Sequence, residues 1–336
     1  MKSALKRYAR PILGLAISAA LLWQLFTHID MGQLRSTLAS AQALPLLLGL
    51  VLVVLGFFLR ALRWHAMVAH FNAQVRLRDS GTAFLSSFAL NNTLPLRAGD
   101  LARTFMFTKD LQVSPATLAA TLLIERLLDA GTLALLLCVG LWMIPAQRLP
   151  VQWQGWIHQA GLVFSLLALG GLLALFLLPK IMMWAIGHFA HTSKGAKLQA
   201  VMRQFGAAFG LLRSPILVFK LLALSLLSWG LEGGVFWAVG QALHIALPSY
   251  APWFALSTAT LATLIPGSPG HLGTFDYFAV LGFGVYGIDR TAAASMAFVV
   301  HVLLWLPVTV VGGVLLLRRQ GVGTLQKIHD LEKEQA

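Results

Sequence analysis

Long uninterrupted apolar runs alternate with short polar stretches along the chain. A helix needs about 20 mostly apolar residues to cross a bilayer, and six runs reach that length. They cover residues 11–27, 43–62, 116–144, 158–179, 215–243 and 291–317. The pattern therefore predicts an all-α polytopic membrane protein with six full transmembrane helices.

Two further apolar segments are each interrupted by proline and glycine. The first, 80–108, is broken at Pro95–Gly99, and the second, 251–287, is broken at Pro266–Gly273. Neither half of either segment is long enough to cross alone as a straight helix. We expect each to form a broken, re-entrant helical hairpin buried among the full spans, where its open backbone groups find partners.

The two broken segments also resemble each other. A shift of 171 residues places Leu94–Leu101 on Ile265–Leu272 and matches a proline, a glycine and a leucine without a gap. In the predicted topology one segment enters the membrane from the cytoplasm and the other from outside. This arrangement predicts an inverted repeat, with units of about 43–144 and 215–317, as in many secondary transporters.

Composition and charge agree with a membrane protein. Of the 336 residues 58% are hydrophobic and 11% are charged, against about 25% charged in soluble domains. With the N-terminus in the cytoplasm, 21 of the 25 Lys and Arg residues lie on the inner side, and Arg126 lies in a span. Only Arg35, Arg148 and Arg290 lie outside. This asymmetry predicts a multi-pass inner-membrane protein with both termini in the cytoplasm.

Several classes of protein are excluded by what the sequence contains. The chain has a single cysteine, Cys138, and its histidines are scattered, so we expect no metal site. The sequence contains no phosphate-binding glycine loop and no evident nucleophile–base pair, so we expect no cofactor and no enzyme activity. The net charge of +13 is read as topology signal and lipid attraction rather than nucleic-acid binding. Residues 1–320 are expected to form one domain, with 321–336 as a short polar tail.

Two segments at the membrane surface have alternative interpretations. The basic N-terminus and the apolar stretch after it favour an uncleaved first helix over a signal peptide, because the stretch contains Trp23 and lacks a clear cleavage site. Residues 180–213 alternate basic and aromatic side chains. They are predicted to lie in the inner headgroup layer, an ordinary solvated loop being the alternative.

Charged residues inside a span are candidates for function, because each costs about 2.5–3.5 kcal/mol at the bilayer centre on insertion scales. Glu125, Arg126 and Asp129 lie within two turns of 116–144, and Arg126 is expected to reach Asp129. One arginine does not neutralise two carboxylates, so either a second cation approaches or one carboxyl is protonated. A structural pair that holds helices together is the alternative to a binding role.

Basic residues also flank the first break. Arg60 and Arg63, at the end of 43–62, are either headgroup ligands or snorkelling anchors. Arg97 and Arg103 would hold a phosphate at the helix break, which Asn92 precedes. Asp100 would cap the following helix or pair with Arg103, and a plain cytoplasmic loop is the alternative.

The second break is rich in glycine and proline, which fix a break and permit close approach of the backbone. Its candidate residues are Pro266, Gly270, His271, Gly273 and Asp276. Two lone polar residues in the neighbouring spans, Glu232 and His301, would line the same cavity or make buried structural hydrogen bonds.

These clusters carry a resemblance to a known family. They read Arg60/Arg63-Trp64, Asn92-x-Leu94-Pro95-x-Arg97-Ala98-Gly99-Asp100-x-x-Arg103, Glu125-Arg126-x-x-Asp129 and Pro266-Gly-Ser-Pro-Gly-x-Leu-Gly-x-Phe-Asp276. In order and spacing they resemble the lysylphosphatidylglycerol synthase transmembrane-domain, or flippase-like, proteins over about residues 1–320. The chain is similar to the flippase half of the multiple peptide resistance factor, which moves aminoacylated phospholipid between leaflets. The resemblance does not extend to the soluble synthase domain, so lipid synthesis is not expected, and His271 and Asp276 stand where Gly and Glu are usual.

The resemblance implies a lipid translocase that binds an anionic, aminoacylated or other polar headgroup. Its partner would be a phospholipid or other polar lipid, and a lipid-modifying enzyme is a possible second partner. Two alternatives belong to other classes. A gradient-coupled carrier of a small solute would have a closed aqueous cavity, and a non-transporting accessory subunit of a lipid or polysaccharide pathway would tolerate loss of the buried charges.

Overall fold

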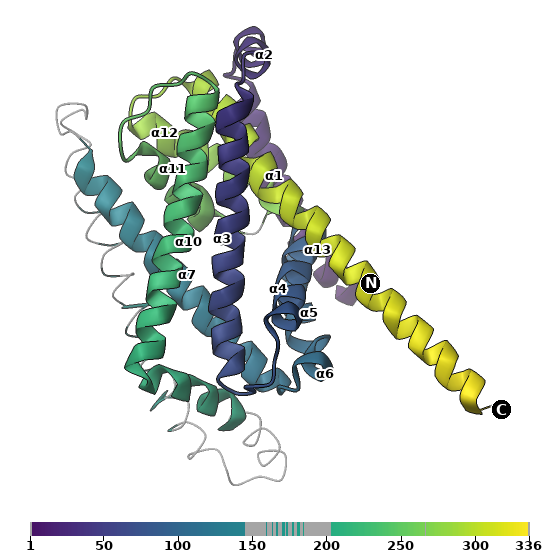
Figure 1. The fold of residues 1–336 in the computed structure, drawn as a ribbon. Coiled ribbons are helices and arrows are strands. Elements are labelled where there is room, and N and C mark those ends of the chain that lie inside the picture. The colour runs from purple at the N-terminus through teal and green to yellow at the C-terminus, as the bar shows by residue number, and fades with distance from the viewer. Residues whose placement is uncertain are drawn as a thin grey trace.

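The fold is taken from a computed structural model. It describes residues 2–144, 203–265 and 267–334, with isolated positions between 159 and 184. In these residues the chain forms helices and turns and no strand, which confirms the all-α prediction (Figure 1). Most of the predicted span 158–179, most of the segment 180–213 and Pro266 lie outside the described residues.

Three described helices are long and apolar enough to cross a membrane by themselves. They are α3 (Ala43–Ala69), α10 (Pro215–Ala242) and the Arg290–Arg319 part of α13 (Arg290–Glu334). The first helix, α1 (Lys2–Phe26), is followed after a 90° bend by α2 (Met31–Ala39), and this pair would make a fourth span. The chain is thus a multi-pass membrane protein, and the count of six spans stays a prediction.

The first predicted break lies where the sequence placed it. The first segment consists of α4 (Leu77–Thr93), the short η1 (Pro95–Arg97) and α5 (Ala98–Phe105), and α5 folds back onto α4. A short helix, α6 (Thr108–Leu111), then leads to α7 (Pro115–Met143), which carries the charged triad.

The second break is confirmed as well. Here α11 (Ala251–Ala262) and α12 (Thr274–Val285) pack against each other, with the short η4 (Pro269–His271) between them. In Figure 1 the two segments lie toward opposite ends of the long α3 and α10 helices, which run side by side.

Backbone geometry explains both interruptions. Pro95 has no N–H group to continue the ladder of α4, and Arg97 takes up a left-handed conformation with φ of 53°. In the second segment Gly270 and Gly273 have φ of 68° and 86°, which glycine adopts without steric penalty. The Asp276 side chain then accepts a hydrogen bond from the Gly273 N–H and starts α12.

Two apolar clusters hold the segments in place. One surrounds the first segment and includes Trp64 of α3 and Ile124 of α7, while the other surrounds the second and includes Phe236 of α10. Close packing requires Gly99, where an added methyl group would collide with the backbone carbonyl oxygen of Ser87 on α4. The charged side chains between these clusters are therefore enclosed by protein on several sides.

Candidate functional site

A polar cavity of about 190 Å³ lies where the two helix breaks meet. The Arg97 guanidinium donates to the Thr263 carbonyl oxygen at 3.1 Å, and the Trp305 indole N–H donates to the Asn92 carbonyl oxygen at 3.4 Å. These contacts join the first break to α11 and the end of α4 to α13. The residues that line this polar cavity are Phe57, Arg60, Phe88, Asn91, Asn92, Arg97, Arg126, Asp129, Trp229, Glu232, Thr260, Thr263, Gly270, His271, Phe275, His301, Leu304, Trp305 and Val308.

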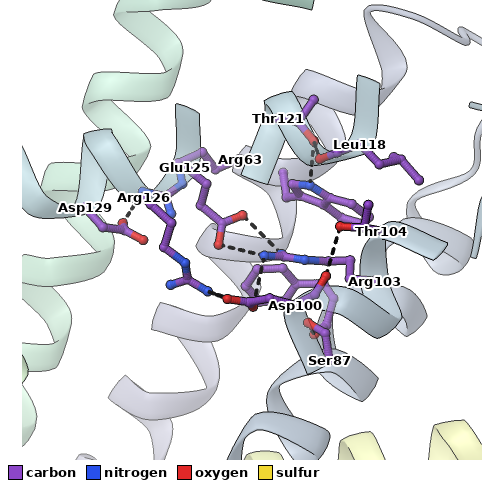
Figure 2. Close-up of polar contacts among 12 residues, drawn as sticks. Arg63, Ser87, Asp100, Arg103, Thr104, Leu118, Thr121, Glu125, Arg126 and Asp129 are labelled. Carbon is purple, nitrogen blue, oxygen red and sulfur yellow. Dashed lines mark hydrogen bonds and ion pairs between the residues drawn. The ribbon is translucent and has the colours of Figure 1, made fainter. Parts of the chain in front are cut away.

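Arg103 and Glu125 form a buried ion pair behind the cavity wall. Two parallel hydrogen bonds of 3.1 Å join the guanidinium of Arg103 to the carboxylate of Glu125, and both residues are 1% exposed (Figure 2). The guanidinium also lies over the rings of Trp64 and Phe84, at 4.9 and 5.2 Å from their centres. Because both charged groups are enclosed and face each other, this contact fastens α5 to α7.

Arg126 reaches across to the first break instead of along its own helix. Its guanidinium lies 2.9 and 3.1 Å from the two carboxylate oxygens of Asp100, and Asn91 donates to the same carboxylate at 2.9 Å. The predicted pair of Arg126 with Asp129 is therefore wrong, because tertiary packing offers Arg126 a nearer carboxylate. Arg103 is only a distant second partner of Asp100, at 3.9 Å.

Asp129 pairs with a cation from another helix. The Arg63 guanidinium of α3 donates to its carboxylate at 2.7 Å, and the Trp229 indole N–H of α10 donates to the same oxygen at 3.0 Å. Arg63 also donates to the Ser225 hydroxyl at 2.7 Å. The sequence left two ways to balance the carboxylates of α7, a second cation or a protonated carboxyl. In the structure further cations do so, with Arg63 beside Asp129 and Arg103 beside Glu125.

Arg60 lies beside Asp129 on the cavity wall and pairs with Glu232 of α10. Its guanidinium stacks over the Trp229 ring, 4.1 Å from the ring centre. Arg60 is 6% exposed and Arg63 is fully buried, so the snorkelling alternative is wrong for both residues. Both side chains extend from α3 to partners inside the protein, Arg60 to Glu232 of α10 and Arg63 to Ser225 of α10 and Asp129 of α7.

The second break meets α13 through a histidine. Nδ1 of His301 lies 2.8 Å from a carboxylate oxygen of Asp276, and Nε2 lies 3.0 Å from the Gly270 carbonyl oxygen. A carbonyl oxygen only accepts, so Nε2 must carry a proton for that bond. The Nδ1–Asp276 contact then also contains one proton, on either the imidazole or the carboxyl. The His301–Asp276 pair as a whole is therefore electrically neutral.

Arg97 differs from the other arginines at this site. Within the described part of the chain it has no carboxylate partner and donates only to the carbonyl oxygen and hydroxyl of Thr263, at 3.1 and 3.3 Å. The Nδ1 atom of His271 and the Thr260 hydroxyl, which also line the cavity, are buried without a hydrogen-bond partner among these residues. The cavity thus has one uncompensated positive charge and unused polar atoms.

The structure divides the predicted site residues into two groups. Those that line the cavity are Arg60, Asn92, Arg97, Arg126, Asp129, Glu232, Gly270 and His271. Those that lie behind its wall and hold it are Arg63, Asp100, Arg103, Glu125, Gly273 and Asp276. His301 joins the first group.

Sequence reasoning did not single out Trp229, Trp305, Thr260 and Thr263, which also line the cavity. Helical spacing would have indicated that the two tryptophans lie near the site. Trp229 precedes Glu232 by three residues and Trp305 follows His301 by four, so each shares a helix face with a lone polar residue.

The chemistry of the cavity is ionic and hydrogen-bonding recognition. Three guanidiniums and two carboxylates face it, together with histidine, asparagine and threonine side chains. Among the described residues no group of three or more His, Cys, Asp or Glu side chains is placed to hold a metal ion. The arrangement suits a charged ligand larger than a single ion, since about 190 Å³ is the volume of about six waters.

Comparison with known proteins places the chain in a family. The sequence profile described as the lysylphosphatidylglycerol synthase TM region matches residues 12–312. The chain belongs to this family. It is also similar to a UPF0104 membrane protein of Methanocaldococcus jannaschii, with 22% identity over 226 residues, which cover 67% of this chain and 92% of that protein. The expected family is thereby confirmed.

Proposed function

We propose that this protein binds the headgroup of an anionic or aminoacylated phospholipid in the polar cavity and moves the lipid between the leaflets of the inner membrane. The observation that carries the proposal is the uncompensated guanidinium of Arg97 at the meeting point of two broken helices. Arg97 is half-buried, and a cation that is partly withdrawn from water without an ion-pair partner is costly, so an anionic ligand would lower that cost.

A phosphate would find two guanidiniums in the cavity. Among the described residues Arg97 has no carboxylate within ion-pair distance, and Arg126 has a side chain that is 32% exposed although it is anchored on Asp100. Arginine binds phosphate oxygens with strong, charge-assisted hydrogen bonds. The buried polar atoms of Thr260 and His271 are further hydrogen-bond partners for a headgroup.

The carboxylates of the cavity would receive a positively charged headgroup. Asp129 and Glu232 line the same space and would accept hydrogen bonds from an ammonium group, as on an aminoacylated lipid. The cavity would thus hold a zwitterionic or cationic headgroup with its phosphate toward Arg97. A simple phosphatidylglycerol would use the arginine side alone.

The proposed path follows an inverted repeat. The first unit, about 43–144, would form the cytoplasmic half of the path and the second, about 215–317, the outer half, with both termini in the cytoplasm. The contact between the first break and α11 and the separation of the two segments in Figure 1 support this arrangement. The chain between residues 1 and 320 would act as one membrane domain.

Reconstitution in liposomes tests the proposal. Vesicles of phosphatidylethanolamine and phosphatidylglycerol would contain a trace of fluorescent phosphatidylglycerol, and its transfer between leaflets would be followed by chemical quenching of the outer leaflet. We expect Arg97→Gln to slow transfer by about 10- to 100-fold, because a hydrogen bond to a charged group contributes about 1.5–3 kcal/mol.

Arg35→Gln is the matched control, since Arg35 is exposed on α2 and is not among the residues that line the cavity. It should transfer lipid like the parent protein. Equal rates for the parent, Arg97→Gln and protein-free vesicles would refute translocation. A parent protein that transports soluble anions but not lipid would identify the small-solute carrier instead.

A further inference from the structure

An apolar groove of about 530 Å³ runs between α3, α4 and α13. Its walls include the buried side chains of Val53 and Ala61, and its rim includes the half-exposed Val54 and Phe58. Almost all of its surface is aliphatic or aromatic. The groove therefore offers a site for hydrocarbon that is partly enclosed by protein.

The groove and the polar cavity share a wall. Phe57 of α3 and Val308 of α13 line both, so these two side chains separate the aliphatic space from the charged one. Pro307, next to Val308, also lines the groove and removes one hydrogen bond from the ladder of α13. A molecule with a polar end in the cavity would pass Phe57 and Val308 to place an apolar end in the groove.

The dimensions of the groove suit a chain rather than a ring. On α3 it extends from Val53 to Ala61, which is about 12 Å at 1.5 Å per residue. Leu315 lies seven residues beyond Val308 on α13, which is about 10 Å, and Leu77 begins α4 shortly after α3 ends at Ala69, so these two residues mark the end of the groove away from the polar cavity. A groove of this length with an almost wholly apolar lining suits a hydrocarbon chain.

We infer that the groove holds one acyl chain of the lipid whose headgroup occupies the polar cavity, an inference that rests on the proposed function. The carbonyl end of the chain lies near Phe57 and Val308, and its methyl end lies toward Leu77 and Leu315. Hydrocarbon next to the charged wall would leave polar groups unsatisfied. The groove lets the chain leave the cavity into apolar surroundings while the headgroup stays bound.

Gly81 provides a way to fill the groove without disturbing the fold. It lines the groove from the interior of α4, and an added Cβ would meet nothing within 4 Å. Leucine is favoured over glycine in a helix interior by up to about 1 kcal/mol. Gly81→Leu should therefore fold at least as well as the parent. Gly313→Leu is the matched control, because Gly313 is also unobstructed and lies on α13 outside the groove lining.

Photocrosslinking in vesicles tests the placement of the chain. The full-length protein would be reconstituted with phosphatidylglycerol that has a photoreactive diazirine either near the carbonyl or near the terminal methyl of one chain, and labelled residues would be mapped by mass spectrometry. We expect the carbonyl-proximal probe to label around Phe57 and Val308, and the terminal probe around Leu77 and Leu315. Gly81→Leu should abolish both patterns, and Gly313→Leu should keep them.

Uniform labelling of the lipid-facing helices that Gly81→Leu leaves unchanged would overturn the inference. The reversed pattern would overturn it too, because it would place the headgroup at Arg78, at the end of the groove away from the cavity. The proposed function fails separately. If the parent protein shows the expected labelling but transfers no lipid between leaflets, translocation is refuted while the acyl site stands.

Discussion

The two broken segments satisfy the polar groups at their helix breaks in different ways. The segment from α4 to α5 places charged side chains at its break and balances them with residues of α7, as in the pairs Arg103–Glu125 and Asp100–Arg126. The segment from α11 to α12 has no arginine in it and closes its break with glycine conformations and the hydrogen bond between Asp276 and His301.

The difference follows from the cost of burying charge. A buried ion requires an opposite charge and further hydrogen bonds, whereas a backbone carbonyl or N–H group requires one hydrogen-bond partner. The first break therefore depends on a second helix for its stability, while the second break is largely satisfied by its own backbone and one histidine. Arg97 is the residue of the first break that this balance leaves without a carboxylate.

The largest effect should come from breaking the charge balance of the first segment. Glu125→Gln leaves the fully enclosed Arg103 without its carboxylate, which typically costs about 3–5 kcal/mol. Unfolding of the purified protein in detergent, followed by circular dichroism, would measure the loss. The double variant Glu125→Leu/Arg103→Leu should recover much of it, because it removes both charges. A single variant as stable as the parent would contradict the structural role of this pair.

A smaller effect should separate the two breaks by their glycines. Gly99→Ala adds a methyl group against the Ser87 carbonyl oxygen and should destabilise by about 1–3 kcal/mol, since backbone must move. Gly270→Ala should cost about 1–2 kcal/mol, for its left-handed φ and a contact with the movable Trp305 ring. Gly230→Ala, with open space around its Cβ, should not destabilise. Thermal unfolding of all three variants would rank their losses of stability. A greater loss of stability for Gly270→Ala than for Gly99→Ala would contradict the expected order of the two breaks.

The smallest effect is expected at the histidine of the second break. His301→Gln removes the ring that bridges Asp276 and Gly270. The glutamine amide keeps one of these two contacts, and the loss of the other costs about 0.5–1.5 kcal/mol if it is a hydrogen bond between uncharged groups. The same unfolding measurement applies. A loss as large as that of Glu125→Gln would mean that the second break also depends on a buried charge pair.

The positions of the two breaks were predictable from the sequence, because proline and glycine act locally on the backbone. Pro95 and Gly270 lie at interruptions that the structure also has. Helices α3, α10 and α13 follow from the apolar runs in the same way. The continuation of α13 to Glu334 was not predictable in this way, because residues 320–336 are polar and contain no apolar run.

The site was predictable as a set of residues but not as a set of contacts. Each predicted charge except the half-buried Asp100 is buried or lines the cavity, because a charge in an apolar run is costly to expose to lipid. The partners were another matter: Arg126 pairs with Asp100 across 26 residues, and Arg63 pairs with Asp129 across 66. Spacing along one helix predicted an ion pair of Arg126 with Asp129, because it contains no information about partners on other helices.

The sequence by itself determined that this chain is helical and membrane-embedded, where its helices break and which residues are out of place in a bilayer. Those properties depend on the local backbone and on transfer of each side chain from water to lipid. Only the tertiary structure decided which cation meets which carboxylate, that Arg97 keeps its charge uncompensated, and that an apolar groove adjoins the polar cavity at Phe57 and Val308. Those properties depend on distances between helices that are far apart in the chain.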